Sequence, residues 1–215
     1  MKVYIIANKT QTSLATAELT RDSAMYHEGY EPFIIKSKNG NEAEDLFDKL
    51  KIIKNPKYPE HSDGAKGCFI SHFMLWQECI NINEPIIICE HDALFINNWT
   101  NPDYKEILHL NCNGSLVRNT KWHEAATNDK IALILENSVY RMNFVPFDYP
   151  DQASMPCAYA YAIKPMAAMK LINDTLQNGY FYVDRFIRES LVEIETIHPP
   201  LAQEQLTSLY ISTTT

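Results

Sequence analysis

A run of four apolar residues, Ile86 to Cys89, constrains the fold more than any other feature, because no polar residue interrupts it. A strand with one solvent-facing side alternates apolar and polar residues, whereas a strand covered on both sides does not. Helices on both faces of a sheet provide such cover, and the strands are then largely parallel. The run therefore predicts a central strand of an α/β protein.

Segments on both sides of this run predict an alternation of strands and helices. Apolar, β-rich runs predict strands at Lys2–Ala7, Pro32–Lys36, Ile131–Leu135 and Tyr159–Ile163. Helical patterns predict helices at Leu14–His27, Gly64–Ile82, Pro165–Asn178 and, shorter, Asp184–Glu193. The stretch from Asn97 to Asp129 lacks periodicity and is expected to form loops with short elements. This order favours one doubly wound domain over residues 1–215, with a mixed, mostly parallel sheet flanked by helices.

Composition narrows the classes of function. With 46% hydrophobic residues, the 215-residue chain can bury a substantial core. The net charge of −8 gives no support to a nucleic-acid substrate, although it does not exclude one. Five scattered cysteines without CxxC spacing fit neither a disulfide framework nor a structural zinc site. The apolar run Val3–Ala7 is too short for a membrane span or a signal-peptide core, so a cytoplasmic protein without a transmembrane segment is expected.

Two carboxylates, Glu90 and Asp92, directly follow the central strand. Their like charges would repel one another and lose hydration at this position, so they need a cationic partner. Mg²⁺ and Mn²⁺ prefer oxygen ligands and also bridge substrate phosphates. In open α/β sheets, ligands bind outside the carboxyl ends of the strands, where this pair would lie. The alternative is a solvated turn after a strand.

The helix that precedes this strand carries a family resemblance. Residues 64–76, GAKGCFISHFMLW, resemble the G-x-x-G-C-x-x-S-H-x-x-x-W helix of glycosyltransferase family 25, which includes lipooligosaccharide and collagen galactosyltransferases. Residues 85–95, PIIICEHDALF, resemble the family's apolar strand that ends in Glu-Asp-Asp. Weaker resemblances cover Ala158–Ile172, Tyr182–Asp184 and Ile197–Gln205. The resemblance implies a GT-A-like fold, a nucleotide-diphosphate sugar donor with UDP favoured, a Mn²⁺ or Mg²⁺ cofactor, and inversion at the anomeric carbon.

The resemblance also implies roles around the acidic pair. Asp92 is expected to bind the metal, and Glu90 is expected to be a second ligand or to contact the donor ribose. His91 stands where the family has an acid, and it either contacts the donor or points away from it. His198 is either a third metal ligand, since imidazole suits Mn²⁺, or a loop histidine without a role.

Further residues are candidates for the remaining tasks. Asp184 is expected to be the base that deprotonates the acceptor hydroxyl, or else to cap a helix that starts at Arg185. Asn8 is expected to contact the nucleotide, and Arg21 to reach the diphosphate. His72 shares a helical stripe with Trp76, which favours a hydrogen-bonded core histidine.

The leading hypothesis is transfer of a hexose from a nucleotide-diphosphate sugar to a hydroxyl, with a saccharide as the expected acceptor. Glycosylation of protein or modified nucleic acid is a related alternative, and a silent nucleotide- or saccharide-binding module is an alternative of another class. Three residues of the irregular middle would either form an acceptor platform or pin a long loop: Trp99, Trp122 and His123.

Overall fold

The computed structural model describes residues 1–58, 61–111, 138–141, 154–155 and 158–205. Its main feature is a seven-stranded sheet of order β2-β1-β3-β7-β5-β8-β6. The strands are β1 (Lys2–Ala7), β2 (Glu31–Lys36), β3 (Ile86–Glu90), β5 (Ile107–His109), β6 (Ser138–Arg141), β7 (Ala160–Ile163) and β8 (Ile194–His198). A separate pair joins β4 (Ala93–Phe95) to β9 (Ala202–Glu204).

The pairing of the strands confirms the expected mixed, mostly parallel sheet. β1 pairs in parallel with β2 and β3, and β5 pairs in parallel with β8. β7 is antiparallel to both β3 and β5, and β6 is antiparallel to β8. Consequently β1, β2, β3, β5 and β8 run in one direction, and β6 and β7 run in the other. The carboxyl ends of β1, β2, β3, β5 and β8 therefore share one edge of the sheet.

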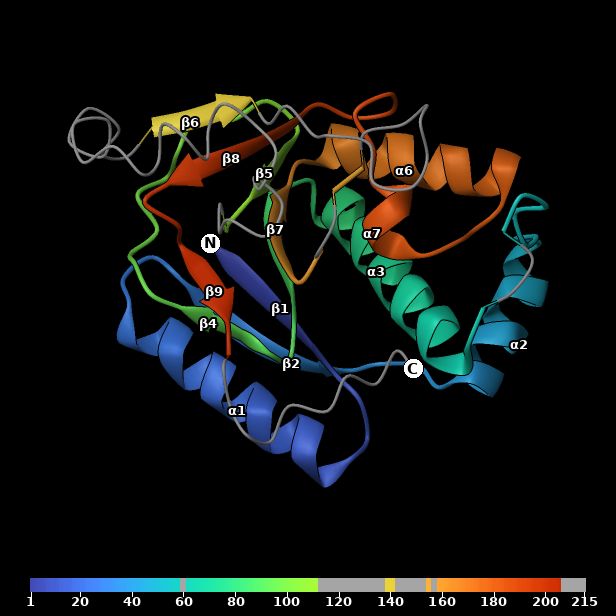
Figure 1. Ribbon diagram of the computed structural model, residues 1–215, viewed down its shortest axis with the longest axis horizontal. Helices are drawn as coiled ribbons and strands as arrows, with labels where there is room; N and C mark the ends of the chain where they lie inside the picture. The colour runs from blue at the N-terminus through green and yellow to red at the C-terminus, as the bar shows by residue number, and fades with distance from the viewer. Residues whose placement is uncertain (59–60, 112–137, 142–153, 156–157, 206–215) are drawn as a thin grey trace.

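Helices cover both faces of the sheet, as the GT-A-like α/β class requires (Figure 1). α1 (Gln11–Tyr26) and the β4–β9 pair lie on one face. The other face carries α2 (Gly40–Leu50), α3 (Asp63–Ile82), α6 (Pro165–Asn178) and α7 (Val183–Phe186). The side chains of β3 alternate between the two cores, and all of the residues from Ile86 to Cys89 are buried. The central position predicted for this strand is therefore confirmed.

Side-chain caps fix where the helices at the carboxyl edge begin. Asn39 and Glu42 form a reciprocal capping box at the start of α2, and the Ser62 hydroxyl accepts from the Ala65 amide at the start of α3. A Cβ atom on Gly67 would collide with the carbonyl oxygen of Lys38. Glycine at this position lets α3 pack directly against the segment that leads into α2, so the two helix starts lie close together.

Several sequence predictions need correction. The helix expected over Asp184–Glu193 is only the four-residue α7. β5 is one of the short elements expected among the loops after Asn97, so that expectation is confirmed for the described part of the stretch. His198 ends β8, which the sequence did not predict, rather than lying in a loop. β5 and β8 are short and have no regular alternation, so periodicity could not identify them.

Two further expectations are not tested by the described residues. The strand expected at Ile131–Leu135 lies outside the described residues, and the single-domain interpretation stays a prediction. Among the residues that the structure describes, no helix has the length and apolarity needed to cross a membrane.

Candidate functional site

A cavity of about 250 Å³ opens at the carboxyl edge of β1, β2 and β3. The segments that follow these strands and the first turns of α2 and α3 form its walls. Its lining residues are Ile6, Asn8, Ser37, Lys38, Asn39, Gly40, Asp63, Gly64, Cys68, Glu90 and His91. Parallel strand ends next to helix starts are the common ligand position in open α/β sheets.

Two helix N-termini give this cavity a preference for anions. Gly40 of α2 and Gly64 of α3 both line it, and helix N-termini carry partial positive charge and amides without partners inside the helix. Caps already use some of these amides, namely those of Glu42 and Ala65. Asp63 also lines the cavity, so the remaining first-turn amides are the groups here that suit a phosphate.

Carboxylates gather around the end of β3, where Glu90 lines the cavity. Burial raises the pKa of Glu90 to about 7, and the charge of Asp92 adds to the shift, with smaller contributions from Asp184 and Glu204. These four residues come from the end of β3, the turn after it, α7 and β9. Asp92 is only 3% exposed, and its Oδ1 atom has no hydrogen-bond partner within the described structure.

The backbone of the acidic turn is held in place from two sides. The Thr20 hydroxyl of α1 lies 2.6 Å from the carbonyl oxygen of His91 and 2.7 Å from that of Ala93. The Gln205 side-chain amide donates to the Ala93 carbonyl and to the Thr20 hydroxyl, and the Gln205 backbone amide donates to the Asp92 carbonyl. Sequence reasoning missed Thr20. The four-residue spacing of Thr16 and Thr20 could have indicated that both hydroxyls lie on one face of α1, which is the buried face.

This arrangement fits a hard divalent cation. In the part of the chain that the structure describes, no Lys or Arg forms an ion pair with Glu90 or Asp92. Buried carboxylates without a counter-charge are costly, and an orphaned carboxylate oxygen is a ready ligand. Mg²⁺ and Mn²⁺ both bind through one or two carboxylates and leave positions for phosphate oxygens.

Other predicted site residues also lie at this edge. Asn8 and His91 line the cavity. The Asn8 side-chain oxygen accepts from the amide and the hydroxyl of Thr10. Burial lowers the pKa of His91, which favours a neutral ring.

Asp184 lies in the first turn of α7, and burial raises its pKa. Its carboxylate accepts backbone hydrogen bonds from its own residue and from Arg185, which offset part of this rise. The N-cap residue of α7 is Tyr182, which makes no side-chain cap. The charge of Asp184 also raises the pKa of both Glu90 and Cys68, so the carboxylate lies near the cavity wall. The helix thus starts before Asp184 rather than at Arg185, so the capping role considered for Asp184 is wrong, whereas its role as a base stays a prediction.

The structure does not bring Arg21 and His198 to the cavity. Arg21 lies in the second half of α1, where it pairs with Glu18 at 2.6 Å and Asp22 at 3.1 Å. His198 ends β8, three strand positions from β3, which corresponds to about 14 Å across the sheet. Trp99 packs its ring near Tyr30, as expected of a loop anchor, and Trp122 and His123 lie outside the described residues.

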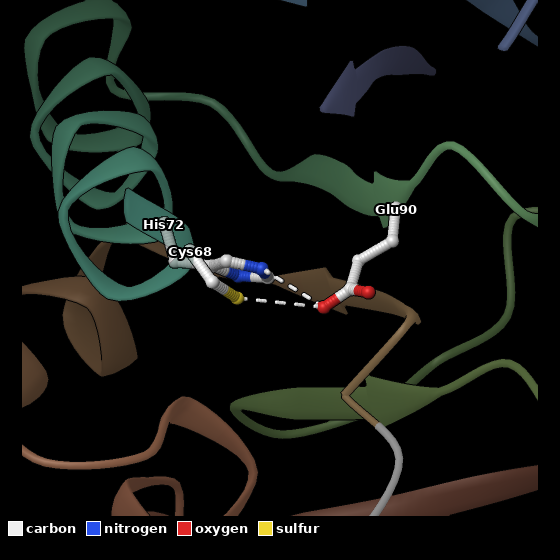
Figure 2. Close-up of side chains that lie close together, drawn as sticks. All are labelled: Cys68, His72 and Glu90. Carbon is white, nitrogen blue, oxygen red and sulfur yellow. Dashed lines mark hydrogen bonds and ion pairs between the residues drawn. The ribbon is translucent and has the colours of Figure 1, made fainter. Parts of the chain in front are cut away.

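A buried polar chain leads from the core to Glu90 (Figure 2). His72 is fully buried, and its Nδ1 atom lies 2.9 Å from the Tyr161 hydroxyl, which also accepts from the Trp76 indole. Burial lowers the pKa of His72 to about 3, so the ring is neutral. The interpretation of His72 as a hydrogen-bonded core histidine is thus confirmed, and Nδ1 is the bonded ring nitrogen. The other, Nε2, faces Glu90 at 3.9 Å without a hydrogen-bond partner among the described groups.

Comparison with known proteins gives a family match over most of the chain. Residues 24–187 match the family described as glycosyltransferase family 25 (LPS biosynthesis protein). The lipooligosaccharide biosynthesis protein lic2B of Haemophilus influenzae is 43% identical over 49 residues, which are 22% of this chain and 18% of that protein. Mouse xyloside xylosyltransferase 1, solved in its apo form, is 11% identical with a TM-score of 0.40, covering 86% of this chain and 80% of that one. A TM-score this low does not establish a shared fold.

Proposed function

Because the chain belongs to glycosyltransferase family 25 and is therefore a glycosyltransferase, we propose that it transfers a hexose from a nucleotide-diphosphate sugar to a saccharide hydroxyl, with Mn²⁺ or Mg²⁺ held by Glu90 and Asp92. The observation that carries this proposal is the orphaned, buried Oδ1 of Asp92 beside a cavity that two helix N-termini line. Glu90 and the two helix starts line the same cavity, so groups that suit a cation and groups that suit a phosphate lie around one space.

Different residues are proposed to bind the different parts of the donor. The amides of the first turns of α2 and α3 hold diphosphate oxygens. Glu90 and Asp92 hold the cation, which as a Lewis acid neutralises the charge that grows on the leaving diphosphate. Asn8 and His91 line the same cavity and are proposed to contact the nucleoside, for which UDP is favoured. Arg21 is left out of this assignment, because Glu18 and Asp22 occupy its guanidinium group.

Asp184 is proposed as the base of an inverting transfer. The acceptor oxygen attacks the anomeric carbon, the bond from that carbon to the diphosphate oxygen breaks, and the nucleoside diphosphate leaves with the bonding electrons. The hydroxyl proton passes to the Asp184 carboxylate. Burial raises the pKa of this carboxylate, which strengthens it as a proton acceptor near neutral pH.

The acceptor is proposed from the relatives. The lic2B protein is described as acting in lipooligosaccharide biosynthesis, which supports a saccharide acceptor here. The net charge of −8 argues against a nucleic-acid acceptor. A cytoplasmic setting is part of the proposal, since Cys68, Cys79 and Cys89 are free thiols.

Release of nucleotide from a panel of nucleotide sugars tests this function. Wild type with Mn²⁺ is expected to release nucleoside diphosphate from one donor, faster when a saccharide acceptor is present, and to stop when a chelator is added. Asp92→Asn is expected to lower the rate at least about tenfold, the loss that removal of one ligand or one supporting partner commonly causes. Asp22→Asn, an exposed acid on α1, is the matched control and should retain the rate. Nucleotide binding without release from any donor would instead indicate a binding module.

A further inference from the structure

A thiol, an imidazole and a carboxylate lie close together beside the cavity. Cys68 and His72 are four residues apart on α3 and therefore project from the same face of the helix, toward Glu90 at the end of β3 (Figure 2). The Cys68 Sγ lies 3.5 Å from the Glu90 Oε1, and the His72 Nε2 lies 3.9 Å from the same oxygen. All three potential ligand atoms lie within 4.8 Å of one another.

These spacings are close to those around a tetrahedral ion. Zinc binds sulfur, nitrogen and oxygen at about 2.0 to 2.3 Å, which sets neighbouring ligand atoms about 3.3 to 3.8 Å apart. The sulfur-to-oxygen distance of 3.5 Å already falls in this range, whereas the nitrogen-to-oxygen distance of 3.9 Å has to shorten when the ion binds. The two elements that carry the ligands are a twenty-residue helix and a central strand, and both pack into the same core.

His72 is arranged as metal-binding histidines are. Its Nε2 atom is fully buried, has no hydrogen-bond partner within the described structure, and points at Glu90. Its Nδ1 atom is fixed by the Tyr161 hydroxyl, which the Trp76 indole also holds. An outer partner on one ring nitrogen is the usual support for a histidine that binds metal through the other. With the proton on Nδ1, the lone pair of Nε2 is directed toward Cys68 and Glu90.

We propose that Cys68, His72 and Glu90 form a binding site for a thiophilic divalent cation, Zn²⁺, whose fourth position opens to the cavity. Sulfur and imidazole ligands select Zn²⁺ over Mg²⁺ and Mn²⁺, so this site differs in preference from the Glu90–Asp92 pair. Binding releases the Cys68 thiol proton to solvent, because zinc binds the thiolate. Cys68 and Glu90 both line the cavity, which provides the entry path.

The site shares Glu90 with the hard-cation pair. If the proposed function holds, Zn²⁺ withdraws one carboxylate from that pair and inhibits transfer in competition with Mn²⁺. The zinc site itself does not depend on the transfer reaction, and its test needs no donor or acceptor.

Co²⁺ replaces Zn²⁺ as a visible probe in the full-length chain. Wild type is expected to bind one Co²⁺ with a thiolate-to-metal charge-transfer band that added Zn²⁺ abolishes. Cys68→Ser should remove the band and lower Zn²⁺ affinity on the order of tenfold or more. Cys79→Ala is the matched control, because it removes another buried thiol of α3 and should leave both readouts unchanged.

Two measurements distinguish failure of the zinc site from failure of the proposed function and from misfolding of a variant. Asp92→Asn should retain the Co²⁺ band, because Asp92 belongs only to the hard-cation pair. In wild type, Zn²⁺ should protect Cys68 from maleimide, as read by mass mapping, while Mg²⁺ should not. A missing band in wild type, a band that persists in Cys68→Ser, or unchanged labelling of Cys68 with Zn²⁺ would overturn the proposal.

Discussion

The hydroxyl of Thr20 lies 2.6 Å from the carbonyl oxygen of His91, although 71 residues separate the two along the chain. This contact joins α1 to the turn that carries Glu90 and Asp92. The Gln205 side chain donates to the same hydroxyl at 2.9 Å. Two distant segments, α1 and the chain at Gln205, therefore fix the backbone of the acidic turn.

Replacement of Thr20 with valine should loosen this turn. The variant keeps the shape of the side chain but leaves buried carbonyls and the Gln205 amide short of a partner, which costs about 1–3 kcal/mol. Urea denaturation measures the loss. Thr175→Val is the matched control, because among the described residues the buried Thr175 hydroxyl bonds only the Leu171 carbonyl of its own helix. An equal loss in both variants would contradict a special role for Thr20.

Asp92→Asn should stabilise the protein when no divalent cation is present. The charge of Asp92 disfavours ionisation of Glu90, so a neutral amide relieves repulsion between buried groups. With Mn²⁺ the order should reverse, because wild type gains about 2.7 kcal/mol when free Mn²⁺ is one hundred times Kd. Thermal unfolding with chelator and with Mn²⁺ measures both effects. A variant that is less stable than wild type in chelator would contradict the repulsion.

Gly67→Ala should separate α3 from the segment that leads into α2. The new methyl group would meet the Lys38 carbonyl oxygen, and overpacking of this kind costs about 1–3 kcal/mol. Met74→Ala, on the more exposed side of the same helix, is the control and should change stability by less than about 0.5 kcal/mol. Denaturant unfolding compares the two. Because alanine inside a helix is favoured over glycine by about 0.5–1 kcal/mol, a gain of that size over wild type would show that the segment moves aside without cost.

The capping box of α2 should give the protein part of its acid sensitivity. The Asn39 amide, followed by Lys9, holds the pKa of Glu42 below its ordinary value of 4.5. The folded state therefore binds this proton less readily than the unfolded state does, and its stabilising contribution is lost as pH falls below about 4.5. Glu42→Gln removes this titration. Its stability deficit against wild type, measured by denaturant unfolding from pH 7 to pH 3, should shrink as pH falls, and a constant deficit would contradict the prediction.

The central part of the fold could be predicted because its signals are local. The uninterrupted run from Ile86 to Cys89 identified the central strand, and Pro165 with Gly179 bounded α6 correctly. The position of Glu90 and Asp92 at the carboxyl edge of the sheet followed from their place directly after that strand. β5 and β8 left no comparable signal, since three to five residues without alternation pair only with distant partners.

The finer arrangement of the site depends on contacts that no sequence spacing encodes. Thr20 and Gln205 are 185 residues apart and meet only through the folded chain. The absence of CxxC spacing argued against zinc, yet the fold places Cys68 and His72 opposite Glu90. Arg21 was expected at the diphosphate because of its charge, and its acidic neighbours on α1 occupy it instead.

The affinity for nucleoside diphosphate, measured by calorimetry with Mn²⁺ and with chelator, tests the central claim most directly. The claim is that Glu90 and Asp92 hold a cation that bridges to the donor. Wild type should bind the nucleotide on the order of tenfold tighter with Mn²⁺, a coupling of about 1.4 kcal/mol. Asp92→Asn should bind with the same affinity under both conditions. Equal tightening by Mn²⁺ in wild type and in Asp92→Asn would contradict the claim.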